Sequence, residues 1–295
     1  PGPRRQRRSL ARRTARRSAV TPRDCIALAA EAHAALTCTP VNRVRLILAD
    51  RHLDLSFDSE ELSDLLTRAV DLLRSDSDIG SGPDAPRPSA RFAVGLNPEI
   101  IESLAQSFEW PRFDRDSQIV MLHEHHRLAI QCAEDGPVGL HWYDAERHAG
   151  VYLARSMRAV TELEQPRPLL RLFAWWAEQH GMLVAHAAAV GTERGCVLFA
   201  GPGGTGKSTA ALAAVGQALR YLGDDCIVID PAARAHALFR TARVWPEMRD
   251  RLRRLQPQDS FEWQSYLGKP TTWVDPAYVT RSAPIKAVRS EEHTS

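Results

Sequence analysis

The residues with the clearest chemical pattern lie at 201–208, where the chain reads GPGGTGKS. In the spacing G-x-x-x-x-G-K-S, glycines let the backbone turn so that successive N–H groups point into one concavity that holds phosphate oxygens. The lysine brings a positive charge to these oxygens, and the serine hydroxyl can ligate Mg²⁺. The residues expected to contact nucleotide phosphates are therefore Gly201, Pro202, Gly203, Gly204, Thr205, Gly206, Lys207, Ser208 and Thr209.

The flanking residues suit a phosphate-binding loop. The preceding run CVLFA at 196–200 favours a buried strand, and the following run STAALAAVGQAL at 208–219 favours a helix. A helix that begins here would point the positive end of its dipole at the same anion. The alternative is a glycine-rich turn that joins a strand to a helix and binds nothing.

An acidic pair, Asp224-Asp225, follows Lys207 by seventeen positions. A helix of about a dozen residues and a returning strand would bring this pair beside the phosphates. A phosphotransferase needs one carboxylate to hold Mg²⁺ and one to accept the proton of the attacking hydroxyl. The alternative is an Asp-Asp turn in a β-hairpin. Asp230, at the end of the run IVID, is a rival magnesium ligand, although Pro231 suggests that this strand leaves the site.

A histidine precedes the loop by fifteen positions, His186 in LVAHAAAVG. A single histidine beside alanines is more often a core residue than a ligand. However, the strand that carries it is expected to run beside the strand that feeds the loop, which would place His186 near the phosphates.

Together these segments resemble the catalytic domain of HPr kinase/phosphorylase and its diverged bacterial relatives, in a superfamily that includes ATP-dependent phosphoenolpyruvate carboxykinase. The resemblance is carried by LFAWWAEQHGMLVAHAAAVG before the loop, by GPGGTGKS itself, and by GDD and HALFRTARV after it. It is strong over about residues 165–245 and weak over 42–164. The chain departs from the family in having His186-Ala187 where the family usually has His-Gly. It also has no second acidic signature beyond the Asp pair, so the HPr substrate and the reverse phosphorylase reaction are not implied.

The resemblance implies a fold and a set of roles. The fold would be α/β, a P-loop HPr-kinase/carboxykinase-like catalytic domain joined to a mainly β (α+β) N-terminal domain. Residues 201–209 would hold ATP phosphates and Ser208 would bind Mg²⁺. The pair Asp224/Asp225 would supply metal coordination and the catalytic base, while Lys207 and His186 would lie at the phosphates.

We therefore expect an ATP-dependent kinase that uses Mg²⁺ and transfers the γ-phosphate to a hydroxyl, a serine of a protein or peptide. Two alternatives stay open: a carboxykinase-like phosphotransferase for a small molecule, and a regulatory module that binds ATP without transferring phosphate. The acceptor is unknown, and a homo-oligomer is left open. An ABC-type ATPase is not expected, because no LSGGQ-like segment follows the loop.

The composition of the chain bounds its class and its partners. Hydrophobic residues make up 44% and charged residues 25% of the 295 residues, which is ordinary for a soluble globular protein. We see no apolar run long enough to span a bilayer, so no membrane partner is expected. The five cysteines are scattered and lack metal-ligand spacing, which suits a reducing cytoplasm. No nucleic-acid partner is expected.

The two ends of the chain are unusual. Residues 1–20 contain eight arginines and no acid, so the rest of the chain has a net charge of 2 − 8 = −6. Such an arm could bind nucleic acid or an anionic surface, but we favour a disordered extension over residues 1–41. Residues 289–295, RSEEHTS, match the translation of a common sequencing adapter. We therefore expect an N-terminal domain at 42–164, a C-terminally truncated kinase domain at 165–288, and a foreign tail.

Secondary-structure cues place further elements. Residues 42–57 predict two strands around a turn at 49–51, residues 59–73 predict a helix capped by Asp58 or Ser59, and residues 75–90 predict a polar loop. Pro166 and Pro168 are expected to open a helix that stops at Gly181. Five short strands are expected between 91 and 163, at RFAVGL, SQIVML, HRLAIQCA, VGLHWYD and GVYLA, and two more at MLVAHAAAVG and GCVLFAG.

Two side-chain groups invite a functional interpretation that we do not favour. Trp175-Trp176 could stack on adenine, but their helical spacing with Leu172 and Phe173 favours a place in the core. The run His123-Glu124-His125-His126 could hold a metal ion. Neighbouring residues of a strand point to opposite faces, so the whole run is not expected to converge on one ion.

Overall fold

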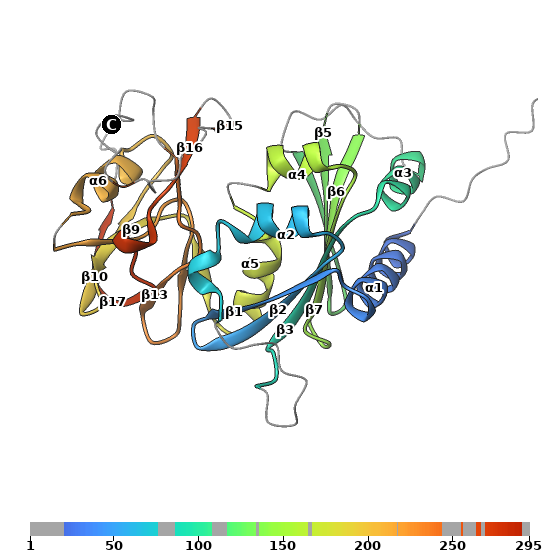
Figure 1. Cartoon of the computed structure of the whole chain (residues 1–295), viewed down its shortest axis with the longest axis horizontal. Coiled ribbons are helices and arrows are strands. Elements are labelled where there is room, and N and C mark those ends of the chain that lie inside the picture. The colour runs from blue at the N-terminus through green and yellow to red at the C-terminus, as the bar shows by residue number, and fades with distance from the viewer. Residues whose placement is uncertain are drawn as a thin grey trace, which may run out of the picture.

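The computed structural model describes residues 21–75, 86–107, 117–133, 136–164, 167–216, 218–243, 255, 264–266 and 269–290. These residues form a mixed α/β protein, with mostly sheet and a few helices, which confirms the α/β class. Figure 1 shows the two larger sheets side by side, with α5 (Leu170–Gln179) between them. The arginine arm at 1–20, most of the expected loop at 75–90, and residues 291–295 lie outside the described residues.

The N-terminal sheet has the strand order β1-β2-β3-β7-β6-β5-β4. β3 pairs in parallel with β2 and β7, and the other pairs are antiparallel. The strands expected between 42 and 154 are all present. They are β1 (Asn42–Leu48), β2 (Arg51–Phe57), β3 (Ala90–Leu96), β4 (Ser117–His123), β5 (His126–Ala133), β6 (Gly136–Asp144) and β7 (Ala149–Ala154).

Helices cover both faces of this sheet (Figure 1). On one face α1 (Pro22–Cys38) and α3 (Pro98–Ser107) pack over β3, β6 and β7. On the other face lie α2 (Glu60–Thr67), the 3₁₀ turn η1 (Asp71–Leu73) and α5. Trp142 and Tyr143, neighbours on β6, enter the two different cores because successive strand residues point to opposite faces. A further helix, α4 (Met157–Leu163), follows β7.

The expectation of a disordered extension over 1–41 is wrong for residues 22–38, which form α1. Thr21 and Asp24 cap its start reciprocally: the Asp24 carboxylate accepts the Thr21 N–H at 2.7 Å, and the Thr21 hydroxyl accepts the Asp24 N–H at 3.3 Å. Cys25, Ala29 and Ala32 then give α1 a buried face at helical spacing. This capping signal directly follows the arginine-rich residues 1–20 in the sequence.

Two other predictions about helices need adjustment. Ser59 is the N-cap of α2, as predicted, and its side chain accepts the Leu62 N–H at 3.2 Å. The helix ends at Thr67, however, and residues 71–73 form a separate 3₁₀ turn. α3 and α4 lie in a region where the sequence suggested mostly strands.

The second large sheet has the strand order β11-β9-β10-β17-β13-β12-β8. β10 and β17 are parallel neighbours, and the other pairs are antiparallel. Its strands are β8 (Leu183–Ala185), β9 (Ala188–Thr192), β10 (Gly195–Ala200), β11 (Arg220–Gly223), β12 (Ile227–Ile229), β13 (Arg234–Ala237) and β17 (Ser282–Ser290). Arg289 and Ser290 pair with the last two residues of β10, so the boundary expected after Val288 falls inside a strand.

A three-stranded sheet and two short helices complete the C-terminal half. The sheet has the order β14-β16-β15. The elements are α6 (Lys207–Ala214), β14 (Thr241–Arg243), β15 (Gln264–Tyr266), β16 (Lys269–Trp273) and the 3₁₀ turn η4 (Pro276–Tyr278). Within the described residues, no helix combines the length and the apolar character needed to cross a bilayer.

One hydrophobic core joins the two halves of the chain. α5, which runs from Leu170 to Gln179 as the prolines and Gly181 predicted, contacts β6, β7 and β8. Phe173 packs edge-on against Phe239, with ring centroids 6.4 Å apart. Trp175 and Trp176 are buried in this core, which confirms the interpretation favoured from the sequence.

A buried carboxyl group, that of Glu164, connects α4 to α5. It accepts the Gln131 amide N–H at 2.8 Å and the Leu169 backbone N–H at 2.6 Å. Leu169, the N-cap of α5, has a left-handed backbone with φ of 55°. His141 Nε2 lies 3.3 Å from the same carboxyl. Burial raises the pKa of Glu164 to about 7 and lowers the pKa of His141 to about 3, so both groups favour their neutral forms.

We expect this carboxyl to make folding stability depend on pH. Because the folded pKa of Glu164 is raised, its contribution is complete below the unfolded pKa of about 4.5 and is lost as the pH rises through about 7. The unfolding free energy falls by about 3 kcal/mol in total, since each pH unit between the two pKa values contributes about 1.4 kcal/mol. Urea unfolding at pH 5 and pH 8 should show a smaller fall in unfolding free energy for Glu164→Gln than for the wild type. Equal falls would mean that the carboxyl is not neutral in the fold.

Candidate phosphate-binding and catalytic site

Residues 201–206 lie between strand β10 and helix α6, which begins at Lys207, so the predicted order of strand, loop and helix is confirmed. Gly201, Gly204 and Gly206 have φ values of 140°, 88° and 87°, which side-chain-bearing residues rarely adopt. A Cβ atom added at Gly204 or Gly206 would meet nothing within 4 Å. These two positions therefore require glycine for its backbone conformation, and the space beside the loop is open.

Lys207, the first residue of α6, lies across the loop. Its ammonium donates hydrogen bonds to the carbonyl oxygens of Gly201 at 2.8 Å and Pro202 at 2.9 Å. The Thr205 hydroxyl donates to the same Pro202 carbonyl at 3.0 Å. Phosphate oxygens form stronger, charge-assisted bonds with an ammonium than neutral carbonyls do. Lys207 is thus positioned where it can exchange a carbonyl partner for an anion.

Ser208 and Asp224 come together, as the spacing predicted. The Ser208 hydroxyl donates a hydrogen bond of 2.7 Å to Asp224 Oδ1, and Asp224 is 4% exposed. The chain returns from α6 through β11, which pairs with β9, and Asp224 follows the last residue of that strand. α6 ends at Ala214 and is shorter than the dozen residues expected. A hydroxyl and a carboxylate are hard oxygen donors, which suit Mg²⁺.

The alternative of an Asp-Asp turn in a β-hairpin is wrong. β11, before the pair, is hydrogen-bonded to β9, whereas β12, after it, is hydrogen-bonded to β8 and β13. Asp225 has φ of 72°, a left-handed conformation that is uncommon for a residue with a side chain. Such strained residues cluster at functional sites, where the surrounding structure holds them in place.

The acidic pair lies at a break between β11 and β12, and a second strand break lies opposite it. The segment predicted as one strand, MLVAHAAAVG, divides into β8 and β9, with His186 and Ala187 between them. Ala185 pairs with Ile227 and Ala189 with Gly223, so the two breaks face each other. Residues 186–187 on one segment and 224–225 on the other lie between these two pairs and belong to neither strand pairing. The side chains of His186 and Asp225 meet there.

Asp225 is held by two basic side chains at these breaks. Its Oδ1 atom lies 3.0 Å from His186 Nδ1, and its Oδ2 atom lies 3.2 Å from the Arg167 guanidinium. The Asp225 side chain is 16% exposed, whereas that of His186 is 56% exposed. His186 therefore lies at the solvent side of this group, and Asp225 lies beneath it.

Arg167 was not predicted from the sequence. It lies between the two prolines expected to open α5, and nothing in its local pattern points to a partner 58 positions away.

Two residues that follow the acidic pair, Cys226 and Asp230, are not candidates for the chemistry of the site. Burial raises the pKa of the Cys226 thiol to about 12, so it stays neutral and does not act as a nucleophile. Asp230 accepts the backbone N–H groups of Ala232 and Arg234, both at 2.9 Å, in a turn beyond β12.

The structure thus brings together five of the residues singled out from the sequence. Lys207 and Ser208 begin α6, Asp224 contacts Ser208, and Asp225 adjoins Asp224 and contacts His186. No protein-family model matches the chain, and a search of curated proteins finds no significant match.

Proposed function

We propose that this protein is an ATP-dependent kinase of the HPr-kinase-like type, which transfers the γ-phosphate to the hydroxyl of a serine in a protein or peptide. The observation that carries the proposal is the hydrogen bond of 2.7 Å between Ser208 and Asp224 at the start of α6. A glycine-rich turn alone would not need a buried carboxylate at its serine. A magnesium-dependent phosphotransferase does need one there.

The roles of the phosphate-binding residues follow from their positions. Backbone N–H groups of Gly201 and of residues 203–206, together with the N-terminus of α6, would bind the phosphates of ATP, and Lys207 would neutralise their charge. Ser208 and Asp224 would hold Mg²⁺, which would screen the charge of the phosphate oxygens when bound. Asp224 is nearly inaccessible to solvent, so it suits a metal ligand better than a group that meets the acceptor.

Asp225 is the better candidate for the base. His186 and Arg167 contact one oxygen each and so orient the carboxylate, while the Asp225 side chain keeps 16% exposure. In the proposed step the acceptor oxygen attacks the γ-phosphorus, its proton moves to Asp225, and the bond to the bridging oxygen of ADP breaks. His186, at the solvent side, would border the path of the acceptor. Asp224 would therefore bind the metal, and Asp225 would accept the proton of the acceptor hydroxyl.

The proposal is tested by incubating the full chain with γ-labelled ATP, Mg²⁺ and a set of serine-containing peptides. We expect label on peptide serine, identified by mass spectrometry, and slow release of labelled phosphate when water replaces the acceptor. Transfer only to small hydroxyl compounds would favour the carboxykinase-like alternative. ATP binding without transfer to peptide, small molecule or water would overturn the kinase proposal and favour a regulatory module.

A further inference from the structure

A group of polar side chains far from the phosphate loop lies at one end of the N-terminal sheet. His125 and His126 lie at the turn between β4 and β5, and Asp144 is the last residue of β6. Strand alternation, which was expected along residues 123–126, does not hold at His125, because Glu124 has φ of 53° and the chain turns there. The turn brings the rings of His125 and His126 to a centroid separation of 4.0 Å.

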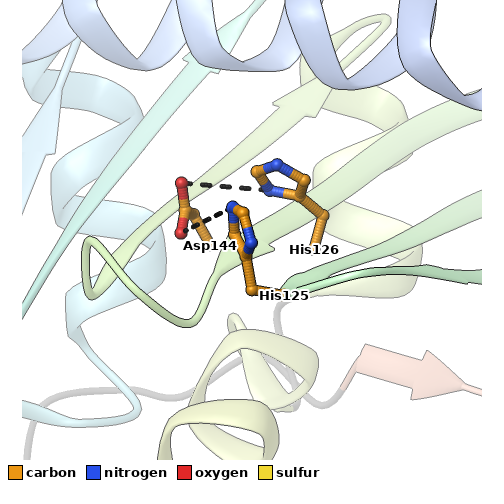
Figure 2. A group of neighbouring side chains, drawn as sticks. All are labelled: His125, His126 and Asp144. Atoms are coloured by element: carbon orange, nitrogen blue, oxygen red, sulfur yellow. Dashed lines mark ion pairs between the residues drawn. The ribbon is translucent and has the colours of Figure 1, made fainter.

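Both imidazole rings face the Asp144 carboxylate (Figure 2). His125 Nε2 lies 3.7 Å from Oδ1, and His126 Nδ1 lies 3.9 Å from Oδ2. One ligand atom from each of the three residues can be chosen so that all lie within 4.8 Å of one another. These separations are too long for hydrogen bonds. They suit atoms bridged by a metal ion, because metal bonds to nitrogen and oxygen are each about 2.0–2.2 Å.

The nitrogen of His126 that faces Asp144 is buried, and among the described residues it has no hydrogen-bond partner. An orphaned nitrogen of this kind is costly unless something binds its lone pair. The ring also stacks on Trp142, with centroids 5.8 Å apart and planes 28° apart, which fixes its orientation.

The other two residues also have neighbouring polar groups. The second nitrogen of His125, Nδ1, lies 3.6 Å from Glu146 Oε1, a carboxylate close enough to accept from the ring after a small shift. Asp144 has no exposed side-chain surface, and its Oδ1 atom accepts the backbone N–H groups of Glu146 and Arg147 at 3.0 and 3.1 Å. His126 and Asp144 are therefore held in place by the fold before any ion binds.

We propose that His125, His126 and Asp144 form a binding site for a divalent transition-metal ion of the Zn²⁺, Co²⁺ or Ni²⁺ class. Two imidazoles and one carboxylate match the ligand preferences of these ions. Mg²⁺ is excluded as the preferred ion, because it selects oxygen ligands. Three protein ligands leave at least one coordination position for water. The site is separate from the phosphate loop, so it does not depend on the proposed kinase activity.

Arg147 competes with the metal in this arrangement. Its guanidinium lies 2.7 Å from Asp144 Oδ2, the oxygen that faces His126, and its side chain is 73% exposed. The arginine can therefore swing into solvent when an ion binds, at the cost of one ion pair. Removing it frees the oxygen in advance. We expect Arg147→Ala to bind the metal about 2- to 5-fold more tightly than the wild type, since ion pairs of exposed side chains contribute little.

The test is a titration of the metal-free full chain with Zn²⁺ by calorimetry and with Co²⁺ by visible absorption. We expect one site per chain, weakened at least 30-fold in His125→Ala. This variant should still fold, since His125 is a turn residue with a partly exposed side chain. His148→Ala is the matched control, because His148 is another turn histidine and lies outside the group. Lys207→Ala should bind Zn²⁺ like the wild type.

Three results would overturn the proposal. The first is the absence of Zn²⁺ binding by the wild type at submillimolar concentration. The second is equal affinity in His125→Ala and His148→Ala, which would place the ion elsewhere, for example on the exposed thiol of Cys38. The third is weaker binding in Arg147→Ala, which would show that Arg147 supports the group instead of competing for Asp144.

Discussion

Asp225→Asn is expected to reduce phosphate transfer by about 10²- to 10⁴-fold, the usual contribution of a positioned general base. The amide keeps the size of the side chain but cannot accept the hydroxyl proton. ATP·Mg²⁺ affinity should change less than about threefold, because Ser208, Asp224 and the loop are untouched. Transfer is measured with γ-labelled ATP, and affinity is measured by calorimetry on the same preparation.

Asp230→Asn is the matched control for this prediction. Asp230 lies in a turn beyond β12, where its carboxylate accepts backbone N–H groups and contacts His236 at 2.9 Å. We expect its transfer rate to equal that of the wild type. If Asp225→Asn transfers phosphate at the wild-type rate while Asp230→Asn does not, the base has been assigned to the wrong aspartate.

The second large effect is expected on nucleotide binding. Lys207→Ala should weaken ATP·Mg²⁺ binding about 10- to 100-fold, because hydrogen bonds to charged groups contribute about 1.5–3 kcal/mol. The variant should fold normally, since in the described structure the ammonium contacts only carbonyl oxygens of the loop, on Gly201 and Pro202. Calorimetric titration with ATP·Mg²⁺ gives the affinity, and thermal unfolding without nucleotide checks the fold.

Lys286→Ala provides a lysine control in the same half of the chain. Lys286 is an exposed residue of β17, and its aliphatic stem lies over Gly195 at the start of β10, the opposite end from the loop. Its loss should leave ATP affinity unchanged. Equal weakening in both lysine variants would indicate a general charge effect and not a contact between Lys207 and phosphate.

Local patterns in the sequence predicted the parts of the candidate site that are short-range. The loop and the start of α6 follow from residues 201–208 alone, because glycine conformations and helix starts are local properties. The return of the pair Asp224-Asp225 to the loop was predicted from one spacing, since a helix and a returning strand leave few places for the acids. The spacing did not predict that α6 would end at Ala214 or that Asp225 would be left-handed.

Contacts between distant segments were not predictable in this way. Arg167 meets Asp225 in a fold where α5 packs against β8 and β8 pairs with β12, and these contacts join segments that are distant in the sequence. His125 and His126 were assigned to a strand, in which alternation would keep their rings apart. Their convergence on Asp144 depends on a turn at Glu124 that carries no glycine or proline to mark it.

The central claim, that the glycine-rich loop and Asp224 form one magnesium–nucleotide site, is tested most directly by the Mg²⁺ dependence of ATP binding. The measurement is calorimetric titration of the full chain with ATP, with and without Mg²⁺, for the wild type and for Asp224→Asn. We expect Mg²⁺ to raise the ATP affinity of the wild type at least tenfold. The Asp224→Asn variant should lose this increase while still binding ATP. No ATP binding by the wild type, or the same Mg²⁺ dependence in both proteins, would contradict the central claim.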